Sequence, residues 1–140
     1  MTATAAAVEL GPREAVEFYL PIMGEYADKL GDILREAAGL NHDFVMNYGP
    51  RTNRIVEAAR LCELCECMMP SIEKLLRRTS TLLEHAEISE DLELVLALRQ
   101  EELEAQFRFA PSILKDLKTN FGRKNIQAVI DRTRVTALRG

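Results

Sequence analysis

A hydrophobic repeat with alternating spacings of three and four residues runs from Arg51 to Ala86 and constrains this chain more than any other feature. Only Thr79 is polar among its positions, which are Ile55, Ala58, Cys62, Cys65, Met69, Ile72, Leu76, Thr79, Leu83 and Ala86. This heptad-like spacing, typical also of coiled coils, places one apolar stripe along a helix roughly 50 Å long, at about 1.5 Å of rise per residue. Such a helix cannot bury its stripe alone, so we expect it to pack against other helices or another chain.

An earlier helix is predicted from Pro12 to Ala38, because its apolar positions alternate in the same way. These positions are Val16, Tyr19, Met23, Tyr26, Leu30, Ile33 and Ala37. Gly39 is a plausible C-terminal stop for this helix. Residues 39–50 are then predicted to form a loop, whose apolar residues 44–46 pack against the end of the bundle.

A third helix is predicted to begin near Ser89, a good N-cap, and to end near Gly122. Its seam toward the core is predicted to contain Leu92, Leu96, Arg99, Leu103, Gln106, Ala110, Ile113 and Leu117. A second apolar stripe, formed by Leu94, Leu98, Ala105 and Phe109, lies roughly on the opposite face. A short last helix, with Asn125 as its expected cap, carries Ile126 and Ile130.

These segments predict an all-α fold, an antiparallel bundle of three long helices plus a short C-terminal helix. Pro21, Pro70 and Pro111 each fall inside one of the long helical segments, so we expect these helices to be kinked rather than interrupted. Residues 1–11 are predicted to be a flexible tail and residues 12–140 a single domain, long enough to form a core without disulfide or metal support.

Charge is distributed unevenly along the second half of the chain. Residues 84–106 carry eight acidic side chains and one arginine, for a net charge of −7, whereas residues 107–140 carry eight basic and two acidic side chains, for a net charge of +6. Either the acidic segment pairs with the basic segment inside one molecule, which we favour, or the basic segment stays free for an anionic partner. The basic segment lacks interleaved aromatic residues and the overall pI is about 5.3, so we do not expect nucleic-acid binding.

The three cysteines lie within six residues, at Cys62, Cys65 and Cys67. Their odd number and close spacing make a poor disulfide framework and suit a reducing compartment, so the expected location is cytoplasmic. On a helix, Cys62 and Cys65 share the apolar stripe while Cys67 points away, which predicts two core thiols and no metal ligands. A thiol-responsive or metal-responsive sensor that uses all three cysteines is the alternative.

Motifs for chemistry are absent from the sequence. Neither His42 nor His85 has a glutamate three residues before it, as di-iron helical bundles require, and no phosphate-binding glycine loop occurs. The longest apolar run, Leu94 to Leu98, is far shorter than the ~20 residues of a membrane span. We therefore expect no enzyme activity, no cofactor and no membrane insertion.

The remaining hypothesis is a non-enzymatic protein-interaction module, such as an adaptor, a regulator or a small chaperone-like protein. Apolar surface left over after the core is formed would bind a protein partner or a second copy in a homodimer. The residues expected at this surface are Leu94, Leu98, Ala105, Phe109, Ile126 and Ile130.

Overall fold

Each apolar stripe found in the sequence lies on a helix, apart from Ala86, which lies outside the described residues. The computed structural model describes residues 11–46, 52–84 and 89–139, which form α2 (Pro12–Met46), α3 (Thr52–Leu83), α4 (Glu90–Phe121) and α5 (Arg123–Arg139). The described residues contain no strand, so the predicted all-α class is confirmed for them. The predicted flexible tail, apart from Gly11, lies outside the described residues.

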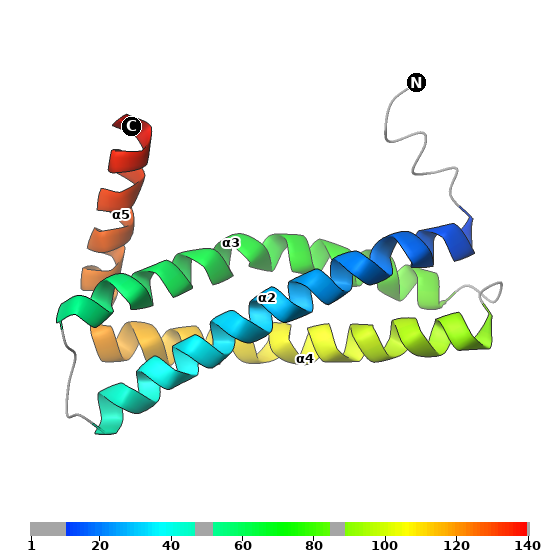
Figure 1. The fold of residues 1–140 in the computed structure, drawn as a ribbon, viewed down its shortest axis with the longest axis horizontal. Helices are drawn as coiled ribbons and strands as arrows, with labels where there is room; N and C mark the ends of the chain where they lie inside the picture. Colours follow the sequence, from blue (N-terminus) through cyan, green and yellow to red (C-terminus); the bar gives the residue numbers. More distant parts are fainter. Residues whose placement is uncertain (1–10, 47–51, 85–88, 140) are drawn as a thin grey trace.

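The core lies where the three long helices meet. In Figure 1, α2 crosses over α3 and α4, and each of the three packs against the other two. Large side chains that are fully buried come from all three helices: Met23, Leu30, Leu61, Ile72, Leu96, Leu103 and Leu117. Burial of each such side chain contributes about 1.5–3 kcal/mol of hydrophobic free energy, which makes this interior the main source of stability.

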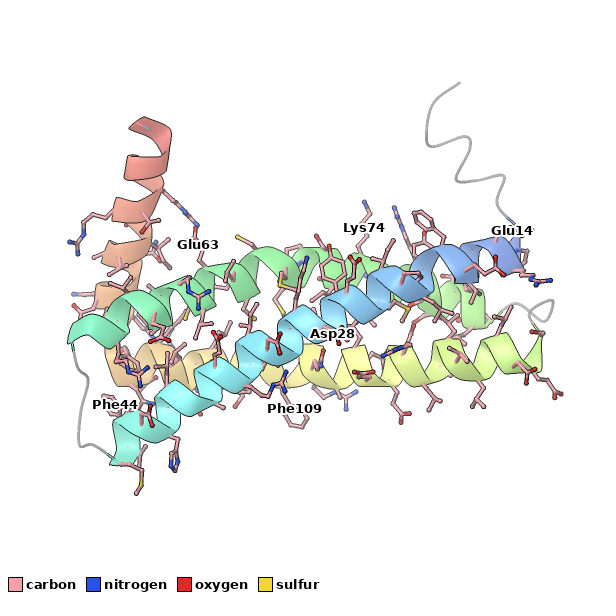
Figure 2. The ribbon with its side chains drawn as sticks, in the orientation of Figure 1. Glu14, Asp28, Phe44, Glu63, Lys74 and Phe109 are labelled. Carbon is pink, nitrogen blue, oxygen red and sulfur yellow. The ribbon has the colours of Figure 1, made fainter. Side chains whose placement is uncertain are left out.

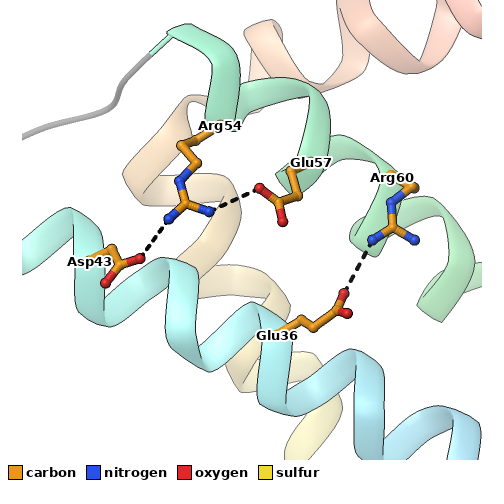
Figure 3. A network of polar contacts seen from close by, with 5 residues as sticks. All are labelled: Glu36, Asp43, Arg54, Glu57 and Arg60. Atoms are coloured by element: carbon orange, nitrogen blue, oxygen red, sulfur yellow. Dashed lines mark hydrogen bonds and ion pairs between the residues drawn. The ribbon is translucent and has the colours of Figure 1, made fainter.

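Ion pairs join the end of α2 to the start of α3 (Figure 3). Arg54 donates from Nη2 to Asp43 Oδ2 at 2.8 Å and from Nη1 to Glu57 Oε2 at 3.0 Å. About two turns away along both helices, Arg60 Nη2 lies 3.2 Å from Glu36 Oε2. Partly exposed pairs of this kind contribute about 0–1 kcal/mol each, so they fix the alignment of the two helices more than their stability.

The first helix is longer than the sequence predicts, because Gly39 does not end it. α2 continues to Met46, and Leu40 in the added segment is buried. Asn41 Nδ2 donates to the carbonyl oxygen of Ile113 at 3.4 Å, and the rings of Phe44 and Phe121 lie 5.6 Å apart. These contacts with α4 stabilise the helix beyond a residue that would otherwise favour its end.

The expected packing of residues 44–46 is confirmed only for Phe44, which is partly buried against the core. Val45 and Met46 are exposed, so that part of the prediction is wrong. The helical turn gives the reason: with α2 continuing through this segment, Phe44 faces α4 while the next two residues rotate away from it.

The start of α4 follows the prediction, but Arg99 of the predicted seam is exposed, and Gln100, Leu114 and Phe121, which were not predicted there, are buried. Ser89 accepts a hydrogen bond from the Leu92 backbone N–H, as an N-cap does. Arg99, predicted on the seam, is exposed and pairs with Glu102 instead. Gln100 is buried in its place. The amide of Gln100 can be hydrogen-bonded there, whereas the guanidinium of Arg99 would require a buried partner charge.

The chain turns sharply between α4 and α5. Gly122 has φ of +89°, a backbone conformation that favours glycine, and α5 runs at a steep angle to the three long helices in Figure 1, packed mainly against α3. Asn125 does not cap α5, because the helix already begins at Arg123. Its Nδ2 donates instead to the carbonyl oxygen of Phe121 at 3.3 Å, at the end of α4.

Candidate functional site

A row of large, exposed apolar side chains runs along the outward side of α4. We call Leu94, Leu98, Ala105 and Phe109 the α4 outer stripe; successive spacings of four, seven and four residues keep them on one side of the helix. Leu94, Leu98 and Phe109 are 60%, 57% and 63% exposed, and Ala105 is half-buried. Phe109 points away from the ribbons of α2 and α3 in Figure 2. The second stripe read from the sequence is thus a surface of the described chain.

Val95 belongs to the same surface, although the spacing of the stripe did not predict it there. Its side chain is 44% exposed, and it lines a shallow hollow of about 230 Å³ together with Leu98, Arg99 and Glu102. The available signal was the uninterrupted apolar run from Leu94 to Leu98, which is wider than one stripe needs.

The apolar side chains of α5 are not part of this surface. Ile126 and Ile130 were expected beside the stripe, but they are only 1% and 5% exposed. α5 packs mainly on α3, where Ile130 and Val129 line a groove with Val56 and Ala59 of α3. The Gly122 turn directs α5 to the other side of the molecule, so its apolar face completes the core and leaves the α4 outer stripe uncovered (Figure 1).

Charged side chains flank the stripe. Glu101 and Arg108 are seven residues apart, lie on the same flank and are both exposed. Within the described part of the chain, neither of them has an ion-pair partner. On the other flank Arg99 Nη1 lies 3.2 Å from Glu102 Oε2. The surface therefore has an apolar centre and a charged rim, as protein-binding surfaces commonly do.

The favoured pairing between the acidic and basic segments is not seen in the two ion pairs that join the basic segment to another helix. Lys118 pairs with Glu66, and Arg134 Nε lies 3.2 Å from Glu63 Oε1, so both basic residues bind α3. The acidic start of α4 lies at the end of the bundle opposite to α5 (Figure 1). α4 has 32 residues and is about 48 Å long at 1.5 Å per residue, so the acidic side chains of its first turn lie too far from α5 for direct contact.

The cysteines occupy the positions expected of core residues. Cys62 and Cys65 are fully buried and Cys67 is exposed, which confirms that part of the prediction. Burial raises the pKa of both buried thiols from 9.0 to about 11; the Lys118 charge lowers it and the Glu66 charge raises it. The protonated thiol is a poor nucleophile and a poor metal ligand, so this environment disfavours sensor chemistry at Cys62 and Cys65.

Metal-ligating groups do not cluster elsewhere in the described residues. No three His, Cys, Asp or Glu side chains among them are placed to hold one ion. His42, expected in a loop, lies exposed on α2, and His85 lies outside the described residues.

An open cavity of about 390 Å³ lies where α3, α4 and α5 meet. Its lining combines an apolar floor with three cations and one carboxylate: Glu66, Met69, Pro111, Leu114, Lys115, Lys118 and Arg123. Pro111 and Met69, the residue before Pro70, both line this cavity, so two helix-interior prolines lie at or next to it. The Lys118–Glu66 ion pair joins two of its walls, and the lining contains no serine, threonine, cysteine or histidine and a single carboxylate.

No protein-family model, curated protein or solved structure matches the chain. None of the described helices has an apolar stretch that could cross a bilayer. Among the described surfaces, the α4 outer stripe is the one with the most exposed large apolar side chains in a single helical line.

Proposed function

We propose that this chain is a non-enzymatic helical protein-interaction module, acting as an adaptor, a regulator or a small chaperone-like protein, and that its partner binds the α4 outer stripe. The observation that supports this most is the exposure of Leu94, Leu98 and Phe109 by more than half on one side of one helix. Burying each exposed half would yield roughly 1 kcal/mol, so the three together offer a useful share of a binding free energy.

An amphipathic helix is the type of partner that fits this surface. The stripe is a single helical line rather than a concave pocket, and a second helix can align its own apolar residues at spacings of three and four along it. The charged rim, with Glu101 and Arg108 on one flank, would fix the orientation of that helix more than its affinity.

We propose a cytoplasmic location, since the free Cys62, Cys65 and Cys67 suit a reducing compartment. The three long helices would form an antiparallel bundle bent at Pro21, Pro70 and Pro111. The absence of paired catalytic groups around the described cavities favours a binding role over an enzymatic one.

Affinity capture with matched variants tests this proposal. Leu98→Asp and Phe109→Asp place a charge in the stripe, and Leu64→Asp is the control because Leu64 is a 42% exposed leucine on α3, away from the stripe. We expect both α4 variants to lose proteins captured from native cells by the tagged wild type, and the control to retain them. All three should keep a helical circular dichroism spectrum. Retention of every captured protein by both α4 variants would show that the stripe is not the binding face.

A further inference from the structure

We propose that the partner of the α4 outer stripe is a second copy of this chain, with the two α4 helices packed antiparallel about a two-fold axis at Ala105. This inference rests on the proposed function and names its partner. It follows from the charge along α4, from the sizes of the stripe residues, and from the fact that no described segment of the chain covers the stripe.

The charge along α4 favours an antiparallel pair. Residues 90–104 carry six acidic side chains and one arginine, whereas residues 107–121 carry three basic side chains and one aspartate. Two parallel copies would place acidic halves side by side. Two antiparallel copies place the acidic half of each helix beside the basic half of the other, and the favourable pairing occurs twice because the interface is isologous.

The side chains of the stripe suggest where the axis lies. Ala105 is the smallest residue of the stripe and lies between Leu98 and Phe109. With Ala105 opposite its own copy, the helices can approach closely at the axis while the larger residues pack on either side. Leu98 then lies level with Ser112 of the second copy, one turn from Phe109 of the second copy, so the large apolar residues alternate across the interface.

The same register pairs charges that have no partner within the described chain. Glu101 lies four residues from the axis, so it is level with Phe109 of the second copy and next to Arg108 of the second copy. Glu101 and Arg108 occupy the same flank of α4, and the two-fold axis brings that flank of one copy against the same flank of the other. Two Glu101–Arg108 pairs therefore form across the interface.

Cysteine cross-linking measures both the association and its direction. Cys67→Ser removes the exposed thiol, while Cys62 and Cys65 stay as they are because they are buried and protonated at neutral pH. In that background, Ala105→Cys should give a disulfide-linked dimer under mild oxidation, because the residue at the axis meets its own copy. Leu94→Cys is the matched control and should not, since its copy lies far along the helix. Equal cross-linking of both would indicate parallel helices and overturn the proposal.

Charge reversal tests the register without relying on a disulfide. Glu101→Arg and Arg108→Glu should each weaken the dimer by roughly tenfold in Kd, and the double variant, which restores opposite charges, should recover most of it. Sedimentation equilibrium provides these constants. If the loss of dimerisation free energy in the double variant equals the sum of the losses in the two single variants, the predicted register is wrong.

The outcomes separate this inference from the proposed function. If the wild type is monomeric and Ala105→Cys gives no dimer, while Leu98→Asp still loses captured proteins, the second copy is excluded and the stripe binds another protein. If Leu98→Asp changes neither self-association nor capture, the stripe is not a binding face and both proposals fail.

Discussion

Thr79 and Gln100 form a buried polar pair between α3 and α4, and substitutions of the two residues should have very different costs. Thr79 is fully buried and Gln100 is 7% exposed. The Thr79 hydroxyl lies within hydrogen-bond distance of Gln100 Oε1 and also 3.0 Å from the Leu75 carbonyl oxygen. Gln100 Nε2 donates to Ser80 Oγ. The hydroxyl has a single hydrogen, so it can donate to only one acceptor at a time.

The asymmetry follows from which atom is left without a partner. Thr79→Val removes the donor to Gln100 Oε1 and leaves a buried acceptor unsatisfied, which should cost about 1–3 kcal/mol of unfolding free energy. Gln100→Leu leaves the Thr79 hydroxyl free to donate to the Leu75 carbonyl, and it adds apolar burial, so we expect a change within about 1 kcal/mol in either direction. Thr79→Val in the Gln100→Leu background should then cost little.

Urea unfolding of the wild type, both single variants and the double variant measures this cycle. The predicted coupling between Thr79 and Gln100 is about 1–3 kcal/mol, with similar m-values for all four proteins. If Thr79→Val costs the same in both backgrounds, the hydrogen bond between the two side chains does not contribute to stability and the argument is wrong.

Three further predictions concern α2 and the cysteines. Gly39→Ala should raise stability by about 0.5–1 kcal/mol in urea unfolding, because Gly39 lies inside a helix and a Cβ there meets no atom within 4 Å; destabilisation would mean that α2 ends at this glycine. Cys65→Ala should cost on the order of 1 kcal/mol by leaving a small void, and Cys67→Ala less, as thermal or urea unfolding can show. The folded-state pKa values of Cys62 and Cys65 are raised from 9.0 to about 11, so the stability that these thiols contribute is complete below pH 9 and is lost as the pH rises toward 11. A variant with alanine at both positions should show a smaller alkaline loss of stability than the wild type, and an identical loss would refute this assignment.

The sequence predicts the helices and the exposed stripe because both depend on local periodicity. The alternation of three and four residues identified the buried Met23, Leu30, Cys62 and Cys65, and the same periodicity separated Leu98 from the core. These inferences need only the geometry of one helix.

The errors concern residues whose places depend on other helices. Gly39 looks like a helix stop until Asn41 meets the carbonyl oxygen of Ile113 on α4. Gln100 rather than Arg99 is buried because Thr79 on α3 supplies a partner. Such contacts join residues far apart in the sequence, so the local spacing of apolar residues cannot predict them.

The path of α5 depends on a single backbone angle. Ile126 and Ile130 are apolar in the same pattern as the stripe, and the φ of +89° at Gly122 sends them into the core instead. The same turn places Arg134 of α5 beside α3, which is why Arg134 pairs with Glu63 rather than with the acidic start of α4. A glycine in the sequence signals that a turn is allowed but not its direction.

Sedimentation equilibrium of the wild type beside Leu98→Asp tests most directly whether the chain associates through the outer side of α4. We expect the wild type to shift toward twice the monomer mass as its concentration rises, Leu98→Asp to remain at the monomer mass, and Leu64→Asp to behave like the wild type. A mass for Leu98→Asp that equals that of the wild type at every concentration would contradict the account.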